Sequence, residues 1–403
     1  MTTLQILPNQ PTYIRQNNST LQYSRDQSSW TKITEFPIKF VNSNAASTPY
    51  INANVFFTTP LTLTTQVVNG VQSVPYFSIG SSNITINGKK NLVTISNIKN
   101  YLGLIQNNKY YNILIQNINI TAVDSTLSYN GQDIGGGWIC QSRFFSGGIL
   151  NCVNNAPINT PYSGGICGSY AGFVGGVACG QLTINNCFNY GQITGQFAGG
   201  ICGPCAVNVI ISRCRNFGEI NAFGCGGICG ALTCSVNITY SYNMGNMVLE
   251  GSGCGGICGA QSGGYGGAAI IHNSYNLGSI ASGCGGILGI YCGLDGGAVI
   301  LRNCYNAGTF ITDNSGIYTG SIYNNQIINC YSVNGLGNWN DTFANASLVA
   351  FPDSSGIGTI WSRSSTTINT PYILTVLPQK SVSQTPKGAR RKKLHNCNKK
   401  SNK

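Results

Sequence analysis

The side chains best suited to chemistry in this sequence are its 18 cysteines. Most recur at matching places in a repeated pattern, so a stacked fold would place them in columns. Stacked residues of neighbouring strands lie about 4.8 Å apart, whereas the Cβ atoms of a relaxed disulfide lie about 3.8 Å apart. We therefore expect buried free thiols packed against isoleucine. The columns are Cys167, Cys202, Cys229 and Cys258; Cys225, Cys254 and Cys284; and Cys152, Cys187, Cys214, Cys304 and Cys330.

Metal binding would require four ligands that converge on one point. Cys202 and Cys205 form the single Cys-x-x-Cys motif of the sequence. Cys225 and Cys229 are four residues apart, which places them about 13 Å from each other on an extended chain. We expect no metal site and no cofactor. A redox role for Cys202 and Cys205 stays open, although no helix is expected beside them to lower a thiol pKa.

The acidic residues number ten, and no two stand as Asp-Asp or Asp-x-Asp. Glycoside hydrolysis needs two carboxyl groups facing each other across the bond to be cleaved. Asp124 and Asp133 flank one loop, and the two histidines are His272 and His395. His272 falls in a column expected to point outward. We expect no catalytic residues and no enzymatic activity, with a degenerate polysaccharide lyase or glycoside hydrolase as an alternative.

Two short phrases alternate along the middle of the chain and organise these residues. They recur every 26 to 35 residues, which is the signature of a stacked array. The first phrase starts at Cys187, Cys214, Ser241, Ser274, Cys304 and, imperfectly, Cys330, as in Cys187-Phe-Asn-Tyr-Gly. The second starts at Gly164, Gly199, Gly226, Gly255 and Gly285, as in Gly199-Gly-Ile-Cys-Gly.

Aligned copies of the repeat contain three apolar columns, which predict three short strands per turn. β-branched and aromatic residues between Gly and Asn favour strands over helices. The fold class is therefore all-β, a parallel β-helix of about 27–30 residues per turn. We expect the Asn column to occupy left-handed corners and to hydrogen-bond from turn to turn. The apolar columns are Ile184, Ile211, Ile238, Ile271, Leu301 and Ile327; Ile193, Ile220, Met247, Ile280 and Phe310; and Ile166, Ile201, Ile228, Ile257 and Ile287; the Asn column is Asn189, Asn216, Asn243, Asn276 and Asn306.

The alternation of these two phrases resembles the GLUG-type repeats of surface and adhesin-like proteins. The Asn- and Ile-rich setting is similar to right-handed β-helix proteins of giant, mimivirus-like DNA viruses of amoebae. The resemblance covers about half of the chain, and it implies a right-handed β-helix. β-Helices serve as enzymes, adhesins and virion parts, so the resemblance is specific for architecture rather than for function.

The repeat also divides the chain into segments. We expect an N-terminal cap over residues 1–50, a parallel β-helix over 51–336 with its Cys- and Gly-rich repeats in 140–336, and a C-terminal cap over 337–379. Residues 380–403 are polar and basic and are expected to be disordered. The N-terminus lacks the features of a signal peptide, and no apolar run is long enough to span a membrane.

The C-terminal tail carries most of the net charge of +12, although charged residues form only 8% of the chain. Its basic residues predict non-specific contact with nucleic acid or with an acidic partner, and a solubilising terminus is the alternative. No aromatic residue interleaves them, so base stacking is not expected. The basic residues are Lys387, Arg390, Arg391, Lys392, Lys393, Lys399, Lys400 and Lys403.

These observations favour a structural, non-enzymatic component of a large DNA virus particle, made in the host cytoplasm. Other virion proteins or further copies of the chain are its expected partners. The main alternative is a glycan-binding or adhesin-like module. Its sugar-stacking stripe, if exposed, would consist of the aromatic column Phe188, Tyr242, Tyr275, Tyr305 and Tyr331; a column that only stabilises the rod is the structural alternative.

Overall fold

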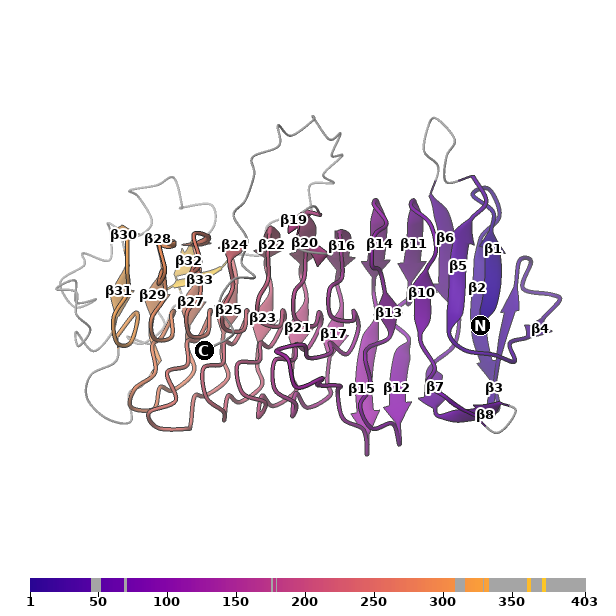
Figure 1. The fold of residues 1–403 in the computed structure, drawn as a ribbon, viewed down its shortest axis with the longest axis horizontal. Coiled ribbons are helices and arrows are strands. Elements are labelled where there is room, and N and C mark those ends of the chain that lie inside the picture. Colours follow the sequence, from indigo (N-terminus) through magenta and orange to yellow (C-terminus); the bar gives the residue numbers. More distant parts are fainter. Residues whose placement is uncertain are drawn as a thin grey trace.

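The computed structural model describes residues 1–44, 52–68, 71–174, 177–178, 180–308, 316–328, 330–332, 361–363 and 372–374. Strands stack in parallel along one rod, from the N-terminal end to β30 and β31 (Figure 1). The described residues contain no α-helix. The predicted all-β solenoid, a parallel β-helix, is confirmed.

Three faces run along the rod, each built from one strand per turn. Face 1 is a 4-stranded sheet in the order β1 (Thr2–Ile6), β5 (Ile38–Asn42), β10 (Phe77–Ile79) and β13 (Ile105–Gln106). Beyond β13 it continues as single-residue parallel bridges, from Ile105 to Cys140 and then along the predicted column Cys167, Cys202, Cys229 and Cys258. Face 1 therefore narrows from strands to bridges where the Cys-rich repeats begin.

Face 2 is the longest sheet, with 13 strands. In spatial order they are β30 (Asn325–Ile328), β28 (Ala298–Arg302), β26 (Ala268–His272), β24 (Ser235–Thr239), β22 (Val209–Ser212), β20 (Leu182–Asn185), β16 (Gly147–Leu150), β14 (Ile113–Gln116), β11 (Ile84–Asn87), β6 (Ala53–Phe57), β2 (Thr12–Asn17), β3 (Thr20–Ser24) and β4 (Thr31–Lys32). The last two pair antiparallel, β3 with β2 and β4 with β3.

Face 3 has ten strands, most of them two residues long in the Cys-rich repeats. Their order is β31 (Tyr331–Ser332), β29 (Tyr305–Asn306), β27 (Tyr275–Asn276), β25 (Tyr242–Asn243), β23 (Arg215–Asn216), β21 (Phe188–Asn189), β17 (Val153–Asn154), β15 (Asn119–Val123), β12 (Leu92–Ser96) and β7 (Leu61–Thr64). Three antiparallel pairs lie outside the faces: β8 (Gln66–Val68) with β9 (Val71–Ser73), β18 (Phe173–Val174) with β19 (Val177–Ala178), and β32 (Trp361–Arg363) with β33 (Tyr372–Leu374).

Strand pairing begins earlier than the boundary expected at residue 51. β1 pairs in parallel with β5, and β2 pairs in parallel with β6, so residues 1–44 already contribute to faces 1 and 2. The antiparallel strands β3 and β4 cover the outer edge of β2. Paired or covered edges cannot template association with another strand. At the N-terminal end of face 2, the edge is thus covered by β3 and β4, whereas β1 and β7 are the edge strands of faces 1 and 3.

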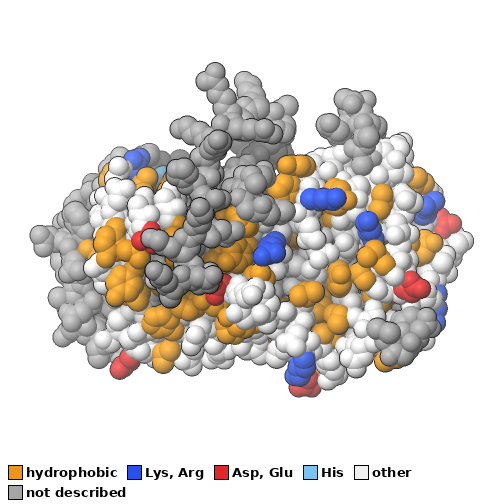
Figure 2. Space-filling view, viewed as in Figure 1, with side chains coloured by type: hydrophobic (Ala, Val, Ile, Leu, Met, Phe, Trp, Pro, Cys, Tyr) orange, Lys and Arg blue, Asp and Glu red, His pale blue; other side chains and the backbone are white. Residues whose placement is uncertain are grey.

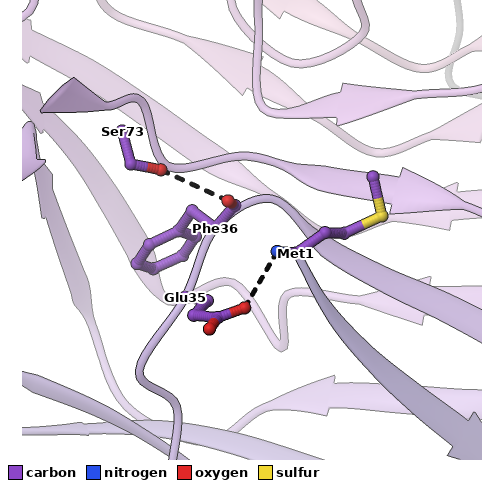
Figure 3. A network of polar contacts seen from close by, with 4 residues as sticks. All are labelled: Met1, Glu35, Phe36 and Ser73. Atoms are coloured by element: carbon purple, nitrogen blue, oxygen red, sulfur yellow. Dashed lines mark hydrogen bonds and ion pairs between the residues drawn. The ribbon is translucent and has the colours of Figure 1, made fainter. Parts of the chain in front are cut away.

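A short polar network lies on this N-terminal end (Figure 3). The amino group of Met1 lies 2.9 Å from Oε2 of Glu35, and the Ser73 hydroxyl donates to the Phe36 carbonyl at 3.2 Å. The Met1 and Glu35 side chains are about half exposed. An exposed ion pair of this kind stabilises a fold by at most about 1 kcal/mol. The β-pairing described above therefore fixes this end of the rod.

The predicted apolar columns form the core. Ile184, Ile211, Ile238 and Ile271 are in register on face 2 and fully buried. The Ile193 column through Ile280 and the Ile166 column through Ile287 are buried as well. Ile327 lies partly buried against the core, and Phe310 is outside the described residues.

The interior changes character along the rod. Near the N-terminus large rings fill it: Phe77 stacks on Phe40 at a centroid distance of 5.4 Å and contacts Phe57 in a tilted arrangement at 5.2 Å. One inward column on face 3 runs Leu61, Val93 and Ile120, and is then continued by Asn154 and the Asn column. The first part of this column is aliphatic, whereas the Asn side chains of the second part lie against glycine residues. In the Cys-rich half, glycine backbone therefore approaches the Asn side chains closely, as at Gly200 and Asn216.

The expected left-handed corners occur at a different column from the one predicted. Asn189 and its equivalents lie within the short strands of face 3 and have no positive φ. Positive φ occurs three residues earlier, at Asn186, Arg213, Tyr240, Asn273 and Asn303, with values of 51° to 55°. These residues form the corner between faces 2 and 3. The prediction was wrong because both columns are rich in Asn, and sequence spacing alone does not show which of them turns the chain.

A Gly200→Ala substitution tests the close approach inside the Cys-rich half. A Cβ at Gly200 would lie 2.2 Å from the Gly227 carbonyl oxygen and 2.7 Å from Oδ1 of Asn216. We expect a loss of about 1–3 kcal/mol of unfolding free energy, as for other overpacked interiors. The measurement is the midpoint of chemical unfolding. Gly148→Ala is the control, because its nearest contact is the flexible Leu114 side chain at 3.2 Å; an equal loss in both variants would contradict the packing described.

Candidate functional site

The buried Asn column of face 3 is the most highly organised polar feature of the structure. Asn154, Asn189, Asn216, Asn243, Asn276 and Asn306 are all fully buried. Each Nδ2 donates to Oδ1 of the next Asn, at 2.7 Å for the first four contacts and 2.9 Å for the last. The predicted hydrogen-bonded Asn ladder is confirmed. Asn154 was missed, although Cys152-Val-Asn carries the same Cys-x-Asn spacing.

The hydrogen-bonding capacity of an inner ladder amide is filled. Nδ2 of Asn189 donates to Asn216 and, at 2.8 Å, to the Gly191 carbonyl. Its Oδ1 accepts from Asn154 and, at 3.2 Å, from the Gly191 backbone N–H. A buried amide without partners would cost several kcal/mol, whereas this one has two donors and two acceptors engaged.

The second glycine of each Gly-Gly-Ile phrase faces this ladder from across the interior. A Cβ on Gly165 would lie 2.9 Å from Oδ1 of Asn189, and one on Gly227 would lie 2.7 Å from Oδ1 of Asn243. Any side chain larger than hydrogen would displace the ladder amides. The Asn of the first repeated phrase and the second Gly of the other phrase thus contact each other across the interior.

The Cys column that precedes the ladder bonds to the backbone. Sγ of Cys187 donates to the Asn185 carbonyl at 3.4 Å and contacts the Ile149 carbonyl of the previous turn at 3.7 Å. Ser241 and Ser274 take the same position, and the Ser241 hydroxyl accepts from the Cys214 N–H at 3.1 Å. Cys and Ser interchange here because both offer one small donor to a carbonyl.

The described cysteines carry thiol groups, as the sequence predicts. The 16 cysteines of the described chain form no disulfides with one another, and all but the half-buried Cys205 are buried. Burial raises the pKa of the Cys140 and Cys258 thiols well above the ordinary value. A thiol with a raised pKa is a poor nucleophile. Cys202 is buried and Cys205 is not, so the two residues of the Cys-x-x-Cys motif differ in access to solvent.

The predicted aromatic column stacks its rings on one another. Tyr242 and Tyr275 lie 4.7 Å apart, and Tyr275 and Tyr305 lie 4.9 Å apart with nearly parallel planes. Both faces of the Tyr275 ring are therefore occupied by neighbouring rings. A bound sugar would need an uncovered ring face. The stacking therefore favours the structural alternative, in which the aromatic column only stabilises the rod. The side chain of Tyr331 is outside the described residues.

Arg215 belongs to the same column and was missed by the sequence analysis. Its guanidinium carbon lies 4.9 Å from the Phe188 ring centre and 5.2 Å from that of Tyr242. A planar cation between two rings continues the stack by cation–π attraction, worth about 0.5–2 kcal/mol per contact. The aligned copies of the repeat already place Arg215 in this column, because it occupies the aromatic position of its own copy.

A second aromatic row lies on the outside of the rod and was also missed. Tyr129 stacks on Tyr162 at 5.7 Å, Tyr162 contacts Phe197 at 5.2 Å, and Phe197 contacts Phe223 edge-on at 5.5 Å. Tyr129 and Phe223 are each 37% exposed. We call Tyr129, Tyr162, Phe197 and Phe223 the outer aromatic row.

Among the described residues, the acidic side chains and His272 form no arrangement with obvious chemistry. His272 lies in the outward column with Thr239 and Arg302, and burial and Arg302 lower its pKa, so it is neutral at pH 7. Desolvation and then a hydrogen bond to Asp133 raise the pKa of Tyr162. Within the described chain no cluster of His, Cys, Asp and Glu is arranged to hold a metal ion. The basic residues predicted in the tail, Lys387 to Lys403, lie outside the described residues.

Comparison of the chain with protein-family models, curated proteins and solved structures finds no match. In the part of the chain that the structure describes, no helix has the length and apolar character needed for a membrane crossing.

An Asn189→Asp substitution tests the ladder. At neutral pH the carboxylate cannot donate to Asn216 or to the Gly191 carbonyl, and it is buried without a counter-ion. We expect a loss of about 3–5 kcal/mol of unfolding free energy. Burial raises the folded-state pKa of such a carboxyl above the unfolded value of about 3.9, so the loss is fully present above the folded pKa and diminishes as the pH falls through it toward the unfolded value.

The measurement is chemical unfolding of this variant across pH. Asn221→Asp is the matched control, because Asn221 is exposed on the neighbouring turn. Stability of Asn189→Asp equal to that of the control at neutral pH would show that the ladder does not hold the turns together.

Thiol reactivity tests the burial of the Cys columns. With a thiol reagent under native conditions, we expect Cys205 to react first among the 16 described cysteines, because the others are buried. Peptide mapping by mass spectrometry identifies the labelled residue, and Cys205→Ser removes the early label from the Cys205 peptide. Early labelling of Cys167 or Cys229 would contradict the closed interior.

Proposed function

We propose that this protein is a non-enzymatic structural component of the particle of a large DNA virus. The observation that carries the proposal is the β-helix scaffold itself, whose interior is filled from end to end by stacked side chains. In the Cys-rich half the interior is closed by amides and glycine backbone rather than hollowed for a ligand. A filled rod is suited to bearing and transmitting contacts along its length.

The surface supports an assembly role through its low charge. Figure 2 shows a face on which charged side chains are few and separated by polar and hydrophobic surface. The whole chain has 8% charged residues. Weak charge lowers the electrostatic repulsion between neighbouring copies in a dense particle. The Asn- and Ile-rich setting of the repeats, which is similar to β-helix proteins of giant viruses, is consistent with the same role.

Partners are proposed to be other particle proteins or further copies of the chain. β30 pairs with β28 on one side, and no described strand pairs with its other edge. Its residues Asn325, Gln326 and Ile328 are exposed and uncharged. An uncharged edge that is unpaired among the described strands accepts an added strand, whereas at the opposite end of face 2 the edge of β2 is covered by β3 and β4.

A glycan-binding module is the second candidate function, and the outer aromatic row favours it. Tyr129 and Phe223 expose part of their rings, which the stacked Tyr275 does not. A glycan array with the intact protein distinguishes the two functions. Binding that is lost in a Tyr129→Ala, Phe223→Ala double variant would support the module.

The particle proposal predicts that the protein is enriched in purified virus particles. We expect its peptides at an abundance comparable with known structural proteins, and retained after a high-salt wash that removes adsorbed host proteins. Quantitative mass spectrometry of gradient-purified particles is the measurement. Absence from the particles, with expression in infected cells, would overturn the proposal.

The tail proposal predicts salt-dependent, sequence-independent binding to nucleic acid. If the eight basic residues contact phosphates, affinity should fall with salt with a logarithmic slope of about −0.9 for each phosphate neutralised. Deletion of residues 380–403 should abolish binding and leave the unfolding midpoint unchanged. Unchanged binding after the deletion, or binding independent of salt, would mean that the tail is only a solubilising terminus.

A further inference from the structure

The loop between Tyr129 and Gly135 contains an Asn-Gly pair, Asn130-Gly131, with an unusual local geometry. The loop is closed by a bridge between Tyr129 and Gly135 and by a hydrogen bond from the Asn130 N–H to the Ile134 carbonyl at 3.2 Å. Asn130 and Gly131 are both exposed. A second Asn-Gly pair, Asn87-Gly88, lies in the described chain and offers a comparison.

The Asn130 side-chain carbonyl is held by two backbone donors. The Gln132 N–H donates to Oδ1 at 2.9 Å, and the Ile134 N–H donates to it at 3.3 Å. Two fixed N–H groups on a carbonyl oxygen stabilise the negative charge that develops there when a nucleophile attacks the carbon. The hydrogen bond from the Gln132 N–H also turns the side chain back toward the peptide that follows Asn130.

The Gly131 nitrogen is available as that nucleophile. Within the described chain its N–H donates to no acceptor, and a Cβ at this position would meet no atom within 4 Å. Its φ is +79°, in the region that glycine adopts without strain. Nothing in the surroundings therefore holds the peptide away from the Asn130 carbonyl.

We propose that Asn130 is a site of spontaneous deamidation built into this loop. Water or hydroxide removes the Gly131 amide proton, the nitrogen bonds to Cγ of Asn130, and the Cγ–Nδ2 bond breaks to release ammonia. The resulting five-membered imide is opened by one water molecule at either carbonyl, giving aspartate or isoaspartate. The reaction consumes water alone and requires no oxidant or reductant. Because the reacting groups belong to one chain, it is a unimolecular step favoured by proximity.

The product changes the loop beside the outer aromatic row. A carboxylate at residue 130 adds negative charge to the loop that contains Asp133, and the pKa of Tyr162 is already raised by desolvation and by its hydrogen bond to Asp133. Isoaspartate also adds a carbon to the backbone next to Tyr129, which stacks on Tyr162. The modification thus alters the charge and shape of one end of this row, independently of the function proposed above.

Asn87-Gly88 shows what protects the same dipeptide elsewhere. Its Oδ1 also accepts two hydrogen bonds, from Lys89 N–H at 2.8 Å and Asn117 Nδ2 at 3.1 Å. The Gly88 N–H, however, donates to the Gln116 carbonyl of the next turn at 2.9 Å. Gly88 is buried, and a Cβ on it would lie 2.6 Å from the Asn117 carbonyl oxygen. The Gly88 nitrogen cannot move onto Cγ of Asn87 without breaking its hydrogen bond to the Gln116 carbonyl.

The test is incubation of the intact protein at mildly alkaline pH, followed by peptide mapping of both sites. We expect the Asn130 peptide to deamidate at least about tenfold faster than the Asn87 peptide, a difference of about 1.4 kcal/mol in barrier. In urea the two rates should become similar, because both are Asn-Gly in an unfolded chain. Asn130→Gln should remove the fast conversion without changing the Asn87 rate.

Three results would overturn the proposal. The first is an unmodified Asn130 under these conditions, and the second is a native rate at Asn130 no faster than that at Asn87. The third is a rate ratio that persists unchanged in urea, since it would assign the difference to sequence rather than to the loop.

Discussion

The contact between a buried asparagine amide and a glycine of the opposite face is the constraint on which the Cys-rich half depends. Each ladder amide needs hydrogen-bond partners on the turn before, on the turn after and at the glycine two residues later in its own turn. The parallel stacking supplies all of them at 2.7 to 3.2 Å. It also needs room, which only glycine gives, because a Cβ at Gly200 would lie 2.7 Å from Asn216. The Asn amide and the glycine therefore recur together once in each turn. The sequence repeat consequently has the length of one turn.

Other columns follow from this arrangement. Once the amides fix the register, the residue before each Asn faces outward at the strand spacing. Planar side chains at that spacing stack, as Tyr242, Tyr275 and Tyr305 do and as Arg215 does between rings. Small residues at the preceding inward position bond to carbonyls of the same turn, which suits both Cys187 and Ser241. Each column repeats one local interaction, so stability is distributed along the rod.

Much of this could be predicted from sequence because a stacked repeat turns spacing into contact. Aligning the copies was sufficient to place Ile184 beside Ile211, Cys202 beside Cys229 and Asn189 beside Asn216. The same alignment does not show which residue turns the backbone, and it says nothing of segments that do not repeat. Two Asn columns three residues apart look alike in sequence, yet Asn186 turns the chain and Asn189 bonds inside it. β1 and β2 carry no repeat, and their pairing with β5 and β6 is visible only in the structure.

The most direct test of the central claim is hydrogen exchange of the asparagine side-chain amides, followed by nuclear magnetic resonance of the folded protein. Each ladder NH2 donates both protons inside the rod, as Asn189 does to Asn216 and Gly191. We expect the Asn189, Asn216 and Asn243 side-chain amides to exchange far more slowly than that of the exposed Asn221. Exchange of the ladder amides as fast as that of Asn221 would contradict a closed, hydrogen-bonded interior.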